Sequence, residues 1–123
     1  MKEYPTVACF SVDDIERARK FYSDTLDLGS NVHQYDDALL VDTAGNTQFY
    51  VYEKADHVPA EHTVLVFSVP DIEGVVSELS QKGVVFQQLA GTNEKGIAGN
   101  GSSKSAWFKD PAGNWIALHE GNQ

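Results

Sequence analysis

Hydrophobic and polar residues follow one another along the chain in a pattern that predicts short strands and two helices. Residues 6–12 (TVACFSV) and 63–69 (TVLVFSV) are rich in β-branched and aromatic residues, which is typical of strands. After each segment, apolar residues recur three or four apart, which predicts an amphipathic helix. The predicted buried stripes are Ile15, Ala18, Phe21, Tyr22 and Leu26 in the first helix, and Ile72, Val75, Val76 and Leu79 in the second.

Aspartates mark the start of both predicted helices. Asp13 and Asp14 offer an N-cap to the first helix, and Pro70 followed by Asp71 does so for the second. Gly83 suits the position just after the second helix. Three short strands are predicted after each helix, at 31–35, 38–42 and 47–53 in the first half and at 84–89, 105–109 and 115–120 in the second.

The two halves share sequence, which indicates an internal repeat. FSVDDIE (10–16) and FSVPDIE (67–73) are identical at six of seven positions, and DTAGN (42–46) and DPAGN (110–114) at four of five. We therefore expect one domain made of two βαβββ modules, residues 1–53 and 62–123, joined by a polar linker at 54–61. The offset between the motifs grows from 57 to 68, which places extra residues in the Gly-rich stretch 90–103, predicted to be a long loop.

A single module covers only one face of its sheet, so the other face must meet something. We predict an α+β fold in which the two tandem βαβββ modules form a cup-shaped, curved mixed sheet with the helices on the outer face. The two-residue period of a strand assigns alternate residues to the cavity. These are Val7, Cys9, Ser11, Gln48, Tyr50, Tyr52, Val64, Val66, Ser68, Trp115, Ala117 and His119. Of the neighbours Trp107 and Phe108, one faces the cavity, and the pattern leaves open which.

Charge and composition narrow the function to a protein that handles small molecules. Nine basic and eighteen acidic residues give a net charge of −9, which disfavours nucleic acid and anionic membranes as partners. No run approaches the roughly 18 apolar residues needed to span a bilayer, and the first residues do not resemble a secretory signal. The single Cys9 cannot form an internal disulfide, which is typical of the cytoplasm, our expected location.

The residues FSVDDIERARKFYSDTLDL near the start and DPAGNWIALHE near the end resemble the vicinal oxygen chelate superfamily. This superfamily includes glyoxalase I, bleomycin-resistance proteins, fosfomycin-resistance enzymes and extradiol dioxygenases. The resemblance implies paired βαβββ modules around a cup and a homodimer. It also implies a divalent metal at Val7, Tyr50, Val64 and Ala117, where three aliphatic side chains and a phenol cannot supply the converging oxygen or imidazole ligands that such ions need. We therefore expect no metal and no cofactor.

Other candidate residues come from the pattern itself. If the strands that carry His62 and His119 ran antiparallel, as the resemblance implies, these side chains would face each other near the rim as an acid–base pair, an anion clamp or a displaced metal site. The alternative is two solvated histidines. Cys9 is a weak candidate nucleophile, and the alternative is a small buried thiol. Trp115, Tyr50 and Tyr52 are interpreted either as a stacking platform for a planar ligand or as core.

Whether the chain is an enzyme stays open at this stage. The main interpretation is metal-independent binding of an organic small molecule in an aromatic-lined cavity, with Tyr50, Tyr52, Trp115, Val7, Val64 and Ala117 in contact with it. One alternative is a lyase, isomerase or dioxygenase of the same superfamily that uses a metal at His62 and His119. The other is a non-catalytic assembly subunit with a filled cavity.

Overall fold

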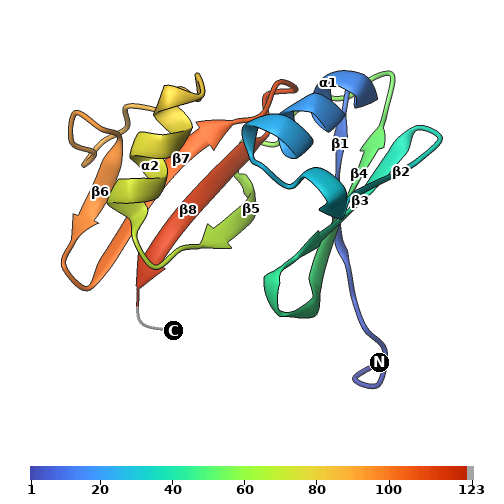
Figure 1. Ribbon diagram of the computed structural model, residues 1–123, viewed down its shortest axis with the longest axis horizontal. Helices are drawn as coiled ribbons and strands as arrows, with labels where there is room; N and C mark the ends of the chain where they lie inside the picture. The colour runs from blue at the N-terminus through green and yellow to red at the C-terminus, as the bar shows by residue number, and fades with distance from the viewer. Residues whose placement is uncertain (122–123) are drawn as a thin grey trace. The chain divides into compact units, whose positions relative to one another are not determined.

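The computed structural model describes residues 1–121, and the chain divides into two compact units, Met1–Pro59 and Ala60–Gln123. The boundary falls inside the stretch 54–61 that separates the two sequence repeats. Each unit holds a four-stranded mixed sheet with a helix on one face (Figure 1). No helix within residues 1–121 is long and apolar enough to cross a membrane.

The first unit contains β1 (Ala8–Val12), α1 (Ile15–Lys20), β2 (Val32–Tyr35), β3 (Ala38–Thr43) and β4 (Thr47–Glu53). Its strands lie in the order β1-β4-β3-β2. Strand β1 runs parallel to β4, whereas β4, β3 and β2 pair antiparallel to their neighbours. Parallel pairing of β1 with β4 requires a long connection between them, and α1 with the β2–β3 hairpin forms that connection.

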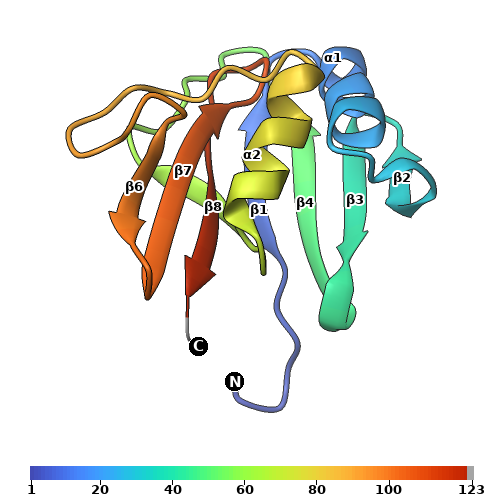
Figure 2. The same cartoon turned by 60° about the vertical axis from the view of Figure 1, so that its left-hand side comes forward.

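The second unit repeats this topology with β5 (Thr63–Ser68), α2 (Ile72–Gln81), β6 (Ile97–Asn100), β7 (Ser103–Lys109) and β8 (Trp115–Gly121). Its strand order is β5-β8-β7-β6, with β5 parallel to β8 and the other pairs antiparallel. Helix α2 contacts β7 and β8 of its own sheet, and Figure 2 shows it next to β8. The α+β class and the tandem βαβββ repeat predicted from the sequence are therefore confirmed.

The helix side of each sheet forms the core of its unit. In the first unit, Phe49 stacks on Phe10, with ring centroids 5.9 Å apart, and meets the edge of Tyr22 at 5.6 Å. In the second unit, Phe86 meets the edge of Phe108 at 5.5 Å. Buried side chains alternate with more exposed ones along the central strands β4 and β7, so each of these strands has one core face and one helix-free face.

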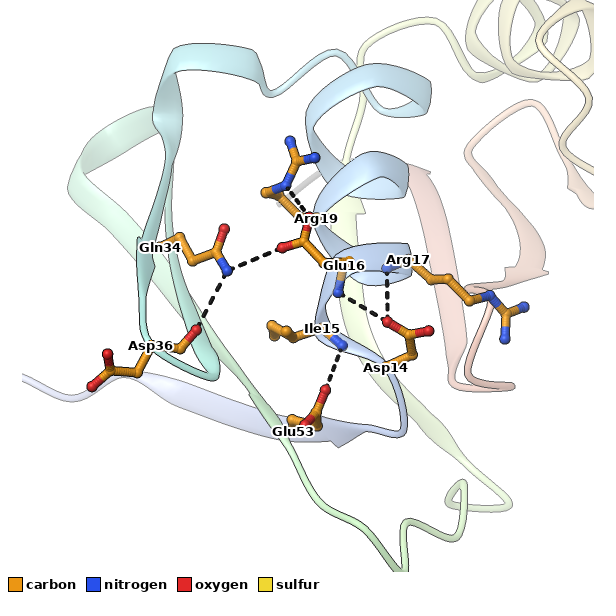
Figure 3. A network of polar contacts seen from close by, with 8 residues as sticks. All are labelled: Asp14, Ile15, Glu16, Arg17, Arg19, Gln34, Asp36 and Glu53. Carbon is orange, nitrogen blue, oxygen red and sulfur yellow. Dashed lines mark hydrogen bonds and ion pairs between the residues drawn. The ribbon is translucent and has the colours of Figure 1, made fainter.

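The first turn of α1 is held by two carboxylates (Figure 3). Asp14 is the N-cap and accepts hydrogen bonds from the backbone N–H groups of Glu16 and Arg17. Glu53, the last residue of β4, accepts from Ile15 N–H at 2.9 Å. Glu53 thus ties the end of the last strand to the start of the helix, and it satisfies a backbone donor that the helix itself leaves unpaired.

The second unit repeats this arrangement. Asp71 caps α2 by accepting from Gly74 N–H, and Glu120 on β8 accepts from Ile72 N–H at 2.9 Å. Gly83 follows the helix with a φ of +96°, as its predicted position after the C-cap requires. The two helix starts are therefore built from equivalent residues at equivalent places.

A polar side chain also links α1 to the neighbouring hairpin (Figure 3). Gln34 on β2 donates to Glu16 at 3.1 Å, and Arg19 donates to the same carboxylate at 3.2 Å. The hydrogen bond from Gln34, followed by the one from Arg19, holds the pKa of Glu16 below its usual value.

The first helix is shorter than its apolar stripe predicts. The α-helix ends at Lys20, and residues Phe21–Thr25 continue as a π-helical segment. This wider turn still directs Tyr22 into the core, where its side chain is fully buried. The stripe therefore predicted the buried residues correctly but not the winding of the backbone.

The strand predicted at 84–89 is wrong, and the loop predicted at 90–103 contains a strand instead. Val84 and Phe86 are buried, but the backbone there bonds to the end of α2 and to the carbonyl of Trp107 rather than forming a strand ladder. Strand β6 lies at Ile97–Asn100 and pairs with β7. Asn100 pairs with Ser103, so Gly101 and Ser102 form the two-residue turn, and a Gly-Ser connection is a hairpin signal that the low complexity of the stretch concealed.

The shared turn motifs DTAGN and DPAGN are out of register by one residue. Tyr50 lies beside Cys9, and Ala117 beside Val66, and these two pairs are equivalent because Cys9 and Val66 occupy the same place in the repeat. The last strands are therefore offset by 67 residues rather than 68. Asp42 consequently occupies the position of Lys109, and not that of Asp110.

Candidate functional site: the helix-free faces of the sheets

On the helix-free face of the first sheet, aromatic and polar side chains of neighbouring strands lie side by side in rows that cross the strands. Strand register places Tyr52 between Ser11 and Ala38, and one row further along it places Tyr50 between Cys9 and Leu40. Because side chains two residues apart share a face, all the members of these rows lie on the same side of the sheet. The face holds Cys9, Ser11, His33, Tyr35, Ala38, Leu40, Asp42, Gln48, Tyr50 and Tyr52.

Two tyrosines form the centre of this face. The rings of Tyr50 and Tyr52 stack with centroids 6.4 Å apart and planes 30° from parallel, and both side chains are only partly exposed. Tyr35, on the edge strand β2, is 60% exposed. Phenol rings present a flat apolar surface with a polar edge, so this face can stack a planar molecule and hydrogen-bond its rim.

A polar cluster lies at one end of the tyrosine pair. Asp42 accepts from Gln48 Nε2 at 2.6 Å with one carboxylate oxygen, and its other oxygen lies 2.9 Å from His33 Nε2. The hydrogen bond from Gln48, followed by the one from His33, holds the pKa of Asp42 below its usual value. Asp42 therefore remains an anion at neutral pH on a largely aromatic surface.

Cys9 is exposed on this face, which corrects the interpretation of it as a small buried thiol. Its cross-strand neighbour is Tyr50, and two residues along β1 the hydroxyl of Ser11 lies 2.7 Å from Nδ1 of His57. The pair of Ser11 and His57 can donate or accept hydrogen bonds to a bound molecule.

The helix-free face of the second sheet carries both tryptophans of the chain. Trp107 pairs with Ala117 and Lys109 with Trp115, so both indoles lie on the face away from α2, and both are partly exposed. Phe108 is fully buried in the core, which settles the choice that the sequence left open. The ammonium of Lys109 lies 4.7 Å from the centroid of the Trp115 ring, in cation–π range.

The structure does not bring His62 and His119 together. Strands β5 and β8 are parallel, not antiparallel as the pairing argument assumed. Thr63, next to His62, pairs with Trp115, while His119 pairs with Ser68 at the other end, about 13 Å further along the strand. His119 Nδ1 instead lies 2.9 Å from the hydroxyl of Ser105. A metal site or acid–base pair formed by these two histidines is therefore ruled out within this unit.

The four positions at which the family resemblance implies metal ligands do not fit a divalent ion. Val7 precedes β1 and is 46% exposed, Val64 lies at a β-bulge in β5, and Ala117 is only 5% exposed. The side chains of Val7, Val64 and Ala117 carry no atom that could bind a metal, and the phenol of Tyr50 is the only polar group at the four positions. Within residues 1–121, no other group of three or more His, Cys, Asp or Glu side chains is arranged to hold a metal.

Of the six predicted contact residues, Tyr50, Tyr52 and Val7 belong to the first unit, and Trp115, Val64 and Ala117 to the second. The predicted stacking surface is therefore two aromatic faces, each with its own polar group. The sequence analysis missed His33, Asp42 and Lys109. The alternation that placed Gln48 and Trp115 could have found Asp42 and Lys109, since these residues pair directly with them.

Part of the loop after α2 lies on the helix side of the sheet, where it forms a cleft with α2, and not on the face that carries the tryptophans. Phe86, Gln88, Glu94 and Lys95 line a cleft of about 500 Å³ together with residues of α2, on the helix side of the sheet. The Asn93 side chain accepts hydrogen bonds from the backbone of Lys95 and Ile97 and so fixes the turn that leads into β6.

Solved structures of the same fold cover nearly the whole chain. The antibiotic binding protein TnmS3 from Streptomyces sp. CB03234 is 23% identical with a TM-score of 0.67, and 97% of this chain aligns with 98% of that one. A glyoxalase/bleomycin resistance protein from Catenulispora acidiphila is 20% identical with a TM-score of 0.69, covering 95% and 97%. The fosfomycin resistance protein FosX from Mesorhizobium loti is 14% identical with a TM-score of 0.69, covering 99% and 95%.

These identities are low, so the likeness to solved structures concerns the fold alone. Comparison with curated proteins gives no match. The family model of the glyoxalase/bleomycin resistance protein/dioxygenase superfamily, by contrast, matches residues 6–118, which include β1 to β7 and the first four residues of β8. The chain belongs to the glyoxalase/bleomycin resistance protein/dioxygenase superfamily.

Proposed function

We propose that this protein binds an organic, largely planar small molecule on the helix-free faces of its sheets and does so without a metal. The observation that carries the proposal is the chemistry of those faces. On one face the rings of Tyr50 and Tyr52 stack, and on the other the ammonium of Lys109 lies over the ring of Trp115. The positions at which the resemblance implies metal ligands hold mainly aliphatic side chains. Such surfaces bind by stacking and burial of apolar area rather than by coordination.

The description of one protein of the same fold supports a binding function. TnmS3, which shares the fold, is described as an antibiotic binding protein, and the FosX protein as a fosfomycin resistance protein. A binding protein needs no catalytic group, which agrees with the separation of His62 from His119. The alternative of an enzyme with a metal at these two histidines has no structural observation in its favour.

Two measurements on tag-free protein test this proposal. The first is elemental analysis, for which we expect no stoichiometric nickel, zinc, iron or manganese; one tightly held metal per chain would overturn the metal-free assignment. The second is a fluorescence titration with planar amphiphiles. Both tryptophans lie on one helix-free face, so a ligand bound there must change their emission and raise the melting temperature. A panel that changes neither quantity would contradict binding at this face.

We further propose that two chains form a homodimer in the cytoplasm. The support is the family resemblance, together with exposed apolar side chains, among them Val7 and Val66, on or next to the edge strands β1 and β5. Light scattering should then give twice the mass of one chain. A monomer at micromolar concentration would contradict the dimer and would leave the binding proposal unchanged.

A further inference from the structure

One cross-strand position carries opposite charges in the two repeats. In the first sheet, the position two residues before Tyr50 is occupied by Gln48, which pairs with Asp42 on β3. In the second sheet, the equivalent pair is Trp115 with Lys109 on β7. A carboxylate and an ammonium thus occupy the same place on the helix-free faces of two otherwise matching sheets.

We propose that Asp42, positioned by His33 and Gln48, recognises a cationic group on an aromatic ligand whose ring stacks on Tyr50 and Tyr52. This inference rests on the proposed function and names the class of ligand for the first sheet. The ligand is a small aromatic molecule that carries an amine, amidine or guanidine one or two bonds from its ring.

The carboxylate of Asp42 has hydrogen-bonding capacity left for such a group. Each of its two oxygens has one partner, Gln48 for one and His33 for the other, whereas a carboxylate oxygen can accept two hydrogen bonds. The side chain is 43% exposed, so the remaining lone pairs are accessible from solvent. The two existing contacts fix the orientation of the carboxylate and lower its pKa, which keeps it charged when a ligand arrives.

Asp42 is also not needed to close the neighbouring turn, unlike its counterpart in the shared motif. Asp110 is buried and accepts hydrogen bonds from the backbone of Ala112 and Asn114 and from the Asn114 side chain. The corresponding turn in the first unit is closed by the hydroxyls of Thr43 and Thr47, which lie 2.6 Å apart. The carboxylate of Asp42 is therefore not occupied in closing the turn.

Distance and charge both suit an aromatic cation. The pair of Asp42 with Gln48 lies one row from the pair of Leu40 with Tyr50, which is about 7 Å along the strands. A nitrogen on a short side arm, together with its contact of about 2.8 Å to a carboxylate oxygen, spans this distance from the ring centre. Within the described residues the only ion-pair partner of Asp42 is His33, so a ligand cation would displace no lysine or arginine. Residues 1–59 hold eleven acidic and five basic side chains, which favours the approach of a cation.

The test compares three probes with one ring system and different charges: 1-naphthylmethylammonium, 1-naphthylmethanol and 1-naphthoate. Their affinities are measured by ligand-observed NMR on the wild-type protein and on Asp42→Asn. We expect the ammonium probe to bind about three- to tenfold more tightly than the alcohol, and Asp42→Asn to abolish this difference while leaving the alcohol unchanged. The control Glu61→Gln removes the same charge from an exposed residue of the other unit and should preserve the difference.

Each outcome has a distinct meaning. If Asp42→Asn binds the ammonium probe as tightly as the wild type does, the cation site is refuted and the binding function stands. If Glu61→Gln loses as much affinity as Asp42→Asn, the effect is one of net charge, and the site is again refuted. If none of the probes binds at millimolar concentration, both the site and the proposed binding at this sheet are refuted. Asp42→Ser, with an unchanged thermal midpoint, guards against a local folding defect in the first variant.

Discussion

The glutamates at the ends of the last strands should stabilise the fold in a measurable and equivalent way in both units. Glu120 accepts a hydrogen bond from the first backbone N–H of α2, at 2.9 Å in a partly buried position. In Glu120→Ala, this N–H loses its charged acceptor, and the start of the helix loses a favourable negative charge. A charged acceptor is worth about 1.5–3 kcal/mol when it is buried, and the helix dipole adds about 0.3–1 kcal/mol. Because the site is only partly buried, we expect a loss of about 1.5–2 kcal/mol.

Urea and thermal unfolding, followed by circular dichroism, measure this loss. For a chain of this size, about 1.5–2 kcal/mol corresponds to a fall of about 5–9 °C in the melting temperature. Glu120→Gln keeps an acceptor oxygen without the charge and should lose about half as much. The control Glu61→Ala changes an exposed glutamate of the same unit and should stay within about 0.5 kcal/mol of the wild type.

The repeat supplies a second, independent measurement. Glu53 makes the same contact with Ile15 N–H at 2.9 Å, so Glu53→Ala should cost a similar amount. The two contacts lie in different units, and the double variant should lose about the sum of the single effects. The reasoning is refuted if Glu120→Ala and Glu53→Ala are as stable as Glu61→Ala. It also fails if Glu120→Gln is as damaging as Glu120→Ala, because the effect would then be one of charge alone.

Three further predictions concern the turn, acid stability and the tryptophan face. Asp110→Ala should lose about 2–4 kcal/mol in urea unfolding, because it removes a buried carboxylate that accepts hydrogen bonds from two backbone N–H groups and from the Asn114 side chain; a loss below 1 kcal/mol would contradict the role of these contacts. Hydrogen bonding lowers the pKa of Glu16 below 4.5 and that of Asp42 below 3.8, so their stabilisation is complete above these ordinary values and is lost as the pH falls through the lowered ones. The urea midpoint should accordingly fall between pH 5 and pH 2.5, and less steeply in Gln34→Ala; an equal slope in that variant would contradict the contribution of Glu16. Trp115→Ala should keep the fold and weaken ligand binding about tenfold in a titration; unfolding of this variant would identify Trp115 as core.

Much of the fold could be predicted from the sequence because local patterns and the repeat agree. The N-cap aspartates mark where the helices begin. The apolar stripes and the two-residue alternation identify the buried side of each helix and strand, and the repeated motifs indicate that the same elements occur twice. The misplaced strand shows the limit of this reasoning. Val84 and Phe86 alternate like a strand but are buried against α2, and the register that makes β6 a strand depends on pairing with β7.

The candidate site was less predictable, because it depends on pairings between strands that are distant in sequence. The alternation correctly placed Tyr50, Tyr52 and Trp115 on the helix-free faces, where the pairing of the strands confirms them. The antiparallel direction of β5 and β8 follows only from the family resemblance, and the prediction that His62 faces His119 is wrong because these strands are parallel. The contact of Asp42 with His33 joins residues nine apart across a hairpin, and no local pattern distinguishes it from two solvated side chains.

A comparison of the two repeats within one chain separates the residues that build the module from those that give each face its chemistry. The helix starts use the same pairs in both units, Asp14 with Glu53 and Asp71 with Glu120. Matched core positions stay apolar although their sizes differ, as in Leu39 against Ala106 and Val41 against Phe108. The helix-free faces differ at every matched position of the last strand: Gln48 against Trp115, Tyr50 against Ala117 and Tyr52 against His119. A face needed only for packing would be expected to keep its apolar character in both copies. The change of charge from Asp42 to Lys109 lies on this side of the sheets, which is why the proposed binding is assigned to the helix-free faces and not to the core.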